Sequence, residues 1–359
     1  MLRPRAGSSG CEWAATLPRR PHRPRMTSHL LQRALHLVPV MLGTTLIVFA
    51  MTTATPGDPV QIMLGDQRAT PEQIAALRHD MGLDLPLAER FVSFVWRALH
   101  GDFGRSFFHR RPVLDVIADR LPATIELTLA AAVLALAIGI PLGLLAGVRR
   151  GRATDRAASI SALIGVSMPG FWLGLLLMLL FSVTLHWLPV SGRTGYGDEP
   201  VPVTHLLLID SLLAGRPAAF AEALRHLALP AITLALPMAA VLMRVTRAAV
   251  IDVLRADYVL FAESKGLSRR RVLLLHVLKN ALAPAVSVAA LEIGALLGGN
   301  MIVETIFAWP GVGRLVVEAI FARNYPLVQA AVLLYAVVFV LLNSLADLLY
   351  GVLNPRIAA

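Results

Sequence analysis

Residues 257–284, with the sequence DYVLFAESKGLSRRRVLLLHVLKNALAP, form a polar, basic segment between two long apolar stretches. Leading into this segment, apolar side chains recur at helical spacing at Val250, Val253, Leu254, Tyr258 and Phe261. Such a repeat of three to four residues is typical of an amphipathic helix that buries one face. The sequence therefore predicts an amphipathic helix at the start of this segment.

The middle of the segment has the residues of a sharp turn between two helices. Gly266 stands where the residue after a helix adopts the left-handed conformation, and Leu267 follows it as an apolar contact. Ser268 is a suitable N-cap for a second helix, whose predicted apolar side is formed by Val272, Leu275, Leu278 and Leu282. Two short helices joined in this way would make a protruding knob that could dock into a partner's groove. An ordinary solvated loop is the alternative interpretation.

The composition places the chain in a membrane. Hydrophobic residues make up 56% of the sequence and charged residues 16%, and the mean hydropathy is +0.67. The formal charge of +10 comes from basic residues in short loops beside apolar stretches, which is the positive-inside pattern and not a nucleic-acid-binding face. A single cysteine, Cys11, excludes an intrachain disulfide framework and a multi-cysteine metal site.

Six apolar stretches predict an all-α integral membrane protein with about six transmembrane helices. They cover approximately residues 34–53, 123–148, 159–187, 227–243, 285–306 and 327–350. Pro169-Gly170 should kink or break the third stretch. The arginine-rich loops after the second and fourth stretches fall on one side, which predicts that both termini are cytoplasmic.

The chain divides into four parts around these stretches. The parts are a disordered basic extension at 1–25, a first transmembrane helix at 28–53, an external region at 54–120, and a five-helix core at 121–359 that contains the cytosolic loop 248–284. Met26 is an alternative start for the protein. Within the external region, Thr70, Pro71 and Gln73 predict the N-cap, first residue and capping box of a short helix.

The chain has no nucleotide-binding P-loop of its own. That motif requires a lysine directly after a glycine, and neither of the two lysines, Lys265 and Lys279, follows one. An ion-coupled transporter would instead place charged groups near mid-membrane. Glu126, Glu304 and Asp347 lie towards the ends of the apolar stretches, where interfacial solvation explains them, whereas Glu292 is the deepest. Glu292, Asn300 and Glu304 are candidates for a translocation pathway, although hydrogen bonding within a helix bundle is the favoured explanation for Glu292. Gly294 and Gly298 would permit close helix packing.

Several motifs together resemble the permeases of ABC importers for dipeptides, oligopeptides and nickel. They are Pro56-Gly57-Asp58-Pro59, Gly101-Asp-Phe-Gly-Arg-Ser106, Ser167-Met-Pro169, Leu188-Pro189-Val-Ser-Gly192, Leu229-Pro230-Ala231, Glu304-Thr-Ile-Phe-Ala-Trp-Pro-Gly311 and Leu348-Leu-Tyr-Gly-Val-Leu-Asn-Pro-Arg356. The segment that opens this section resembles the family's cytosolic signature loop, because its central glycine and terminal proline are kept. It departs from the family's usual Glu-Ala-Ala opening, since the corresponding residues are Leu260, Phe261 and Ala262.

The resemblance implies a type I importer fold and a set of partners. In that family the loop is a coupling helix that docks in a cleft of the ATPase, which assigns the role to Asp257, Tyr258, Ala262, Glu263, Lys265, Gly266, Leu267, Ser268, Arg271, Asn280 and Pro284. The implied partners are a homologous second permease, two cytosolic ABC ATPases that bind the ATP, and an external solute-binding protein, with this chain in a bacterial inner membrane. No cofactor or metal on this chain is implied.

Two other classes of protein remain as alternatives. A stand-alone ion-coupled transporter would move solute without an ATPase and would be expected to contain an inverted repeat, which is not visible in the sequence. An intramembrane hydrolase would require Ser167 and His186 to act together, but they are many turns apart and no third orienting group is evident. The transported solute is not identified by the sequence.

Overall fold

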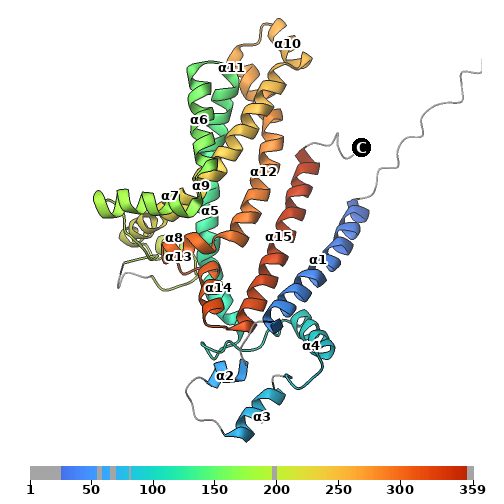
Figure 1. Ribbon diagram of the computed structural model, residues 1–359. Coiled ribbons are helices and arrows are strands. Elements are labelled where there is room, and N and C mark those ends of the chain that lie inside the picture. The colour runs from blue at the N-terminus through green and yellow to red at the C-terminus, as the bar shows by residue number, and fades with distance from the viewer. Residues whose placement is uncertain (1–25, 55–58, 65–69, 81, 196–199, 354–359) are drawn as a thin grey trace, which may run out of the picture.

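The computed structural model describes residues 26–54, 59–64, 70–80, 82–195 and 200–353, and every regular element among them is helical (Figure 1). The α-helices are α1 (Met26–Ala54), α2 (Pro59–Leu64), α3 (Pro71–Asp80), α4 (Leu87–Leu99), α5 (Val113–Val148), α6 (Ala153–Ser167), α7 (Gly170–Leu177), α8 (Leu207–Leu213), α9 (Pro217–Leu254), α10 (Asp257–Ser264), α11 (Arg269–Arg271), α12 (Leu278–Gly299), α13 (Met301–Ile306), α14 (Val312–Phe321) and α15 (Tyr325–Leu353). Two π-helices are η1 (Met178–Thr184) and η2 (Val272–Val277). The all-α prediction is confirmed, and the predicted extension at 1–25 lies outside the described residues.

The longest helices, α5 and α9, pack against each other along a stripe of glycines. A methyl group added at Gly143 would lie 2.6 Å from Thr246 Cβ and 2.7 Å from the Met243 carbonyl oxygen. Gly139 and Gly147, one turn away on either side, also face α9 at such short range. Small residues at every fourth position let two helix backbones approach closely. Gly294 and Gly298, which were predicted to permit close helix packing, do not lie in such a tight contact. A methyl group added at Gly294 would make only ordinary van der Waals contacts with α15, and one added at Gly298 would have nothing within 4 Å.

We expect Gly143→Ala to lower the free energy of unfolding by about 1–3 kcal/mol, the usual cost of overpacking a well-filled interior. The methyl group would meet the backbone of α9, which cannot move aside as a flexible side chain can. Gly298→Ala is the matched control, since it adds the same methyl group to open space and improves helix propensity. Unfolding in detergent, followed by circular dichroism, measures both. Equal stability of the two variants would contradict the tight α5–α9 contact.

Within the part of the chain that the structure describes, four helical segments are long and apolar enough to cross a membrane. They are Val113–Val148, Pro217–Leu254, Arg269–Gly298 and Tyr325–Leu345. The predicted third span is instead two helical pieces, Ala153–Ser167 and Gly170–Thr184, bent by 104°. The bend confirms the predicted break, because Pro169 has no N–H to continue the helical hydrogen bonds. Figure 1 shows α7 projecting sideways from the bundle.

The remaining predicted spans differ in their boundaries. The second and fourth begin earlier than predicted, and α9 passes through Pro230 and Pro237 without ending. The predicted fifth span is divided at Asn300 into α12 and the short α13. The predicted first span lies within α1, whose 29 residues run from Met26 to Ala54. Helices α8 and α14 were not predicted. Both lie between the predicted spans.

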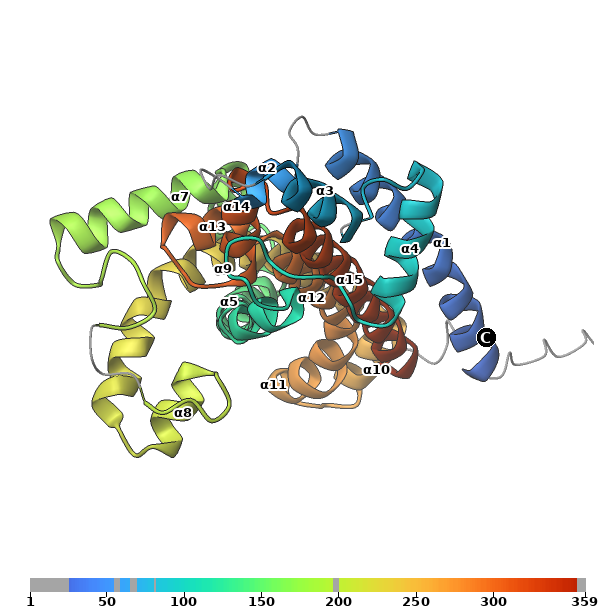
Figure 2. The ribbon, with the colours of Figure 1, turned by 90° about the horizontal axis from the view of Figure 1, so that it is seen from below.

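Helices α2, α3 and α4 gather at one end of the molecule, and α10 and α11 lie at the other (Figure 1). The capping box of α3 is confirmed, since the Thr70 N–H donates to Gln73 Oε1 at 3.0 Å and the Gln73 N–H donates to Thr70 Oγ1 at 3.3 Å. Helix α4 lies beside α1 in both ribbon views (Figures 1 and 2) and stacks Phe94 on Phe49, with ring centroids 6.1 Å apart. The predicted external region therefore packs against the bundle.

Candidate functional site

The segment between α9 and α12 forms a helical hairpin at one end of the molecule (Figure 1). Its turn is as predicted, because Gly266 has a φ of +78°, in the left-handed region. The Gly266 N–H donates to the Glu263 carbonyl oxygen at 2.9 Å, and the Leu267 N–H donates to that of Ala262 at 3.4 Å. This pair of bonds is a Schellman motif, which ends α10 and reverses the chain.

The first arm of the hairpin is not the single helix that the sequence predicted. Helix α9 ends at Leu254, and α10 starts afresh at Asp257 after two residues outside either helix. Because of this interruption, a different side of α10 faces the bundle than a continuous helix would present. The predicted apolar face is confirmed at the end of α9, where Val250 is buried and Val253 and Leu254 pack against the same cluster. It is wrong for α10, in which Tyr258 and Phe261 are exposed and Val259 and Ala262 are buried.

The second arm begins at the predicted place, and its predicted apolar face is confirmed only in part, since Val272 is buried while Leu278 and Leu282 are half-buried. Ser268 occupies the N-cap position with an extended backbone, although its side chain makes no capping hydrogen bond. Because η2 has wider turns than an α-helix, the buried positions are Val272, Val277 and Ala281, separated by five and then four residues. Leu275, predicted to be buried, is exposed.

A small apolar core holds the two arms against the bundle. Its buried members are Val250, Val259, Ala262, Val272, Val277 and Ala281. Leu144 and Val148, from the end of α5, pack against this cluster. Across the arms, Asn280 Nδ2 donates to Tyr258 Oη at 3.0 Å and to the His276 carbonyl oxygen at 2.8 Å. The hairpin is thus packed as a unit with the ends of α5 and α9.

These contacts divide the residues that the resemblance assigned to the loop into a buried group and an exposed group. Ala262 is buried in the hairpin core, Leu267 is half-buried beside it, and Pro284 is half-buried within α12. The exposed members are Asp257, Tyr258, Glu263, Lys265, Gly266, Ser268, Arg271 and Asn280. Only this second group is available to another protein.

Sequence reasoning missed two exposed apolar side chains at the tip of the hairpin. Leu260 is 54% exposed and Phe261 is 61% exposed. The Lys265 ammonium lies 4.5 Å from the centroid of the Phe261 ring, a cation–π contact at the surface. The signal was present in the sequence, because these are the positions that depart from the family's usual opening. Together, Leu260, Phe261 and Lys265 are called the hairpin tip below.

An ion pair between half-buried Arg247 and buried Asp155 joins α6 to α9. The Arg247 guanidinium binds both carboxylate oxygens of Asp155, with distances of 2.5 and 2.9 Å, and the Gly151 N–H adds a bond of 2.8 Å. Such two-pronged pairing fixes orientation as well as distance. Arg247 lies 92 positions after Asp155 in the sequence, which explains why their pairing was not predicted.

The candidate pathway residues lie in different surroundings. Glu304 is fully buried, and its carboxylate accepts from Thr124 Oγ1 at 2.8 Å and from the Arg314 N–H at 2.9 Å. Asn300 is also buried and donates from Nδ2 to Thr128 Oγ1 at 3.3 Å. Glu292 is half-buried on α12, about 12 Å from Asn300 along a helix rising 1.5 Å per residue. The structure therefore joins Asn300 and Glu304 to α5 and leaves Glu292 outside that network.

Interfacial solvation is the wrong explanation for two of the acidic residues. Glu304 is fully buried and has no exposed surface. Glu126 is also buried, and it pairs with Arg193 at 2.6 Å and accepts from the Leu208 N–H at 2.7 Å. Both acids are solvated by protein donors from segments far away in the sequence. The side chain of Asp347 lies outside the described part of the structure.

Comparison with known proteins identifies a family over most of the chain. A family described as "Binding-protein-dependent transport system inner membrane component" matches residues 139–359, and its N-terminal counterpart matches residues 26–128. A di/tripeptide transport system permease protein, DppB of Pseudomonas aeruginosa, is 43% identical over 92% of this chain and 99% of its own length. The dipeptide transport system permease protein DppB of Escherichia coli is 44% identical over the same shares. A glutathione transport system permease protein, GsiC of Salmonella choleraesuis, is 39% identical, again over these shares.

Proposed function

The chain belongs to the family of inner membrane components of binding-protein-dependent transport systems, the permeases of ABC importers, and we propose that it carries short peptides across a bacterial inner membrane. The substrate class is inferred from relatives named for dipeptides, di- and tripeptides and glutathione, which is itself a tripeptide. The relatives are transport permease subunits and not enzymes, so the hydrolase alternative is not supported.

The family also indicates which partners supply energy and substrate. A binding-protein-dependent ABC importer requires ATPase subunits and a solute-binding protein. We propose that a homologous second permease completes the translocation pathway. We further propose that ATP is bound only by the partner ATPases, because the sequence has no lysine in a P-loop context. An independent ion-coupled transporter is not favoured, since it would need no such partners.

The proposed mechanism rests on one observation: a rigid hairpin with an exposed apolar tip is built directly into two long helices. Its first arm follows α9 after a two-residue break, and its second arm continues into α12 as part of the 30-residue helical segment Arg269–Gly298. A partner that grips the tip would therefore move α9 and α12 together. Closure of the ATPases on ATP would in this way switch the permease between inward-facing and outward-facing states.

The proposed orientation places the hairpin in the cytosol. The loop between α5 and α6, with Arg149, Arg150 and Arg152, lies at the same end of the molecule (Figure 1). Positive charge in short loops favours the cytosolic side of a bacterial membrane. The start of α1 and the end of α15 also point towards this end (Figure 1), which supports cytoplasmic termini. In this orientation α2, α3 and α4 would lie outside.

Gly266→Arg tests the proposed docking of the hairpin. Nothing lies within 4 Å of an added Cβ, so the protein should still fold and insert. An L-residue in the left-handed conformation is strained by about 1–2 kcal/mol, which would relax the turn and weaken ATPase binding about tenfold. Co-purification of the ATPases with the tagged permease, titrated with ATPase, measures the effect.

Gly215→Arg is the matched control for this experiment. Gly215 has a φ of +63° and open space around it, but it lies just before α9, at the opposite end of that helix from the hairpin. The control should bind the ATPases as the unmodified permease does. Equal binding by the Gly266→Arg and unmodified permeases would reject the docking role of the hairpin.

A further inference from the structure

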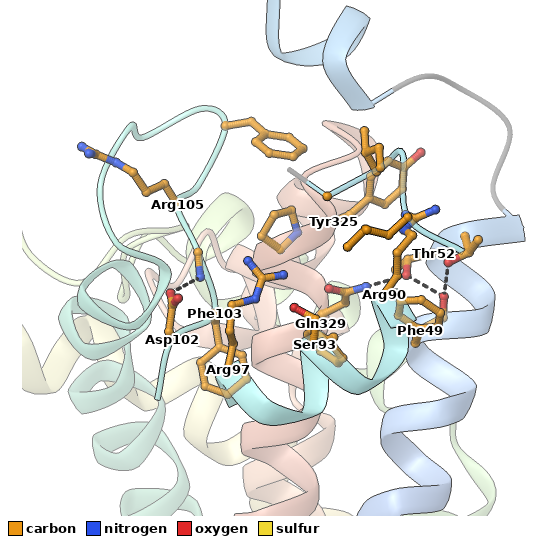
Figure 3. A pocket seen from close by; sticks show the side chains of 18 of the residues that line it. Phe49, Thr52, Arg90, Ser93, Arg97, Asp102, Phe103, Arg105, Tyr325 and Gln329 are labelled. Carbon is orange, nitrogen blue, oxygen red and sulfur yellow. Dashed lines mark hydrogen bonds between the residues drawn. The ribbon is translucent and has the colours of Figure 1, made fainter. Parts of the chain in front are cut away.

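A cavity of about 480 Å³ lies at the opposite end of the molecule from the hairpin. It is enclosed by the end of α1, by α4, by the segment around residues 102–107 and by the start of α15 (Figure 3). This volume is typical of sites for small organic molecules, which usually occupy about 300–1,000 Å³. The cavity is separate from the hairpin and contains none of the residues assigned to it.

Positive charge dominates the cavity. Arg90, Arg97 and Arg105 line it, whereas Asp102 is the one acidic residue among the described residues of the lining. The Oδ1 atom of Asp102 accepts from the Gly104 N–H at 2.9 Å. Neither Arg90 nor Arg97 forms an ion pair within the part of the chain that the structure describes. Two guanidinium groups therefore border the cavity without an acidic partner.

The arginines differ in where they point. Figure 3 shows the Arg97 guanidinium in the middle of the cavity, while Arg105 extends away from it. Arg105 is occupied elsewhere, because it donates to the Arg110 carbonyl oxygen at 2.6 Å. Arg90 is half-buried, with its Cζ atom 6.0 Å from the centre of the Phe49 ring. Arg97 and Arg90 are thus the groups available to an anionic ligand.

Aromatic side chains form part of the rest of the lining. Phe49, Phe94, Phe103 and Phe107 supply apolar walls. Tyr325 also lines the cavity, and its hydroxyl oxygen is buried without a hydrogen-bond partner. Buried polar atoms in folded proteins are normally paired, so an orphaned hydroxyl beside a cavity indicates a missing partner.

We propose that this cavity binds a small molecule with a carboxylate group and an apolar or aromatic body. The flat fork of an arginine matches the two oxygens of a carboxylate, which assigns the charged end of the ligand to Arg97, with Arg90 alongside. The phenylalanine rings would cover the apolar body. The site would be occupied independently of ATPase binding, so its test does not rest on the transport function proposed above.

The test uses the full chain purified in detergent and isothermal titration calorimetry with N-acetyl-phenylalanine. Its amide, N-acetyl-phenylalaninamide, has the same body without the charge and should bind at least about tenfold more weakly, as expected for loss of a charge-assisted bidentate contact. Arg97→Gln should reduce binding of the acid to the level of the amide. Arg216→Gln, at an exposed arginine that does not line the cavity, should leave binding of the acid unchanged.

Two results would overturn the proposal. One is equal binding of the acid and the amide, or of the acid to the unmodified protein and the Arg97→Gln variant. The other is a phosphate-only site, in which glycerol phosphate binds in an Arg97-dependent manner while N-acetyl-phenylalanine does not. Arg97 is exposed, so the substitution should not affect folding, and circular dichroism of the variant verifies this.

Discussion

Glu304→Leu is expected to lower the free energy of unfolding by about 2–5 kcal/mol. Leucine has a similar size, so the change removes an acceptor without opening a large cavity. The Thr124 hydroxyl and the Arg314 N–H, which both donate to the Glu304 carboxylate, would stay behind in a buried position. Each buried donor that loses its acceptor costs about 1–3 kcal/mol. Unfolding of the purified protein in detergent measures the loss.

The neighbouring glutamate provides a matched control. Glu318 accepts from the Arg314 side chain at 2.7 Å, but it is half exposed. Water can replace that contact, so Glu318→Leu should change the stability by no more than about 0.5 kcal/mol. A similar small effect for Glu304→Leu would mean that the Glu304 network does not hold α13 and α14 against α5.

The same network explains why glycines stand at the N-cap of α14 and in its first turn. A methyl group added to Gly311 would overlap the Glu304 carboxylate, and one added to Gly313 would lie 2.9 Å from its Oε2 atom. Trp309, beside them, is buried and donates from Nε1 to the Ala123 carbonyl oxygen at 2.9 Å. The residues of the Glu304–Gly311 motif therefore pack around the buried Glu304 carboxylate.

The second large effect is expected at the hairpin tip. The double substitution Leu260→Asp/Phe261→Asp should weaken ATPase binding on the order of a hundredfold. Both side chains are more than half exposed in the isolated chain, so their apolar surface is available for burial by a partner. Burying the exposed halves of two large apolar side chains contributes about 3 kcal/mol, and each 1.4 kcal/mol changes an affinity tenfold. ATPase co-purification and solute-stimulated ATP hydrolysis by the reconstituted importer measure the loss.

A second exposed apolar pair provides a control that distinguishes loss of docking from a general loss of stability. Ile320 and Phe321 are 54% and 84% exposed at the end of α14, away from the hairpin. Ile320→Asp/Phe321→Asp introduces the same charges on another short helix and should leave ATPase binding unchanged. If the tip variant binds the ATPases as well as this control does, Leu260 and Phe261 face something other than the ATPase.

The features that the sequence predicted correctly depend on a few neighbouring residues. A glycine followed by leucine and serine was enough to predict the turn at Gly266, because the left-handed conformation is a property of one residue. The capping box at Thr70 and the break at Pro169 are equally local. Apolar stretches of bilayer length likewise established the all-α membrane class, since backbone groups in lipid must pair within their own helix.

Other features were decided only when distant segments came together. Whether Tyr258 or Val259 faces inward depends on the helix break after Leu254, and the face of the second arm depends on the widened turns of η2. Thr124 and Glu304 lie 180 positions apart in the sequence, so the sequence does not reveal the hydroxyl that stabilises this buried carboxylate. Hydropathy along the chain reports the average preference of a segment, whereas burial of a polar group depends on whether a donor meets it in space.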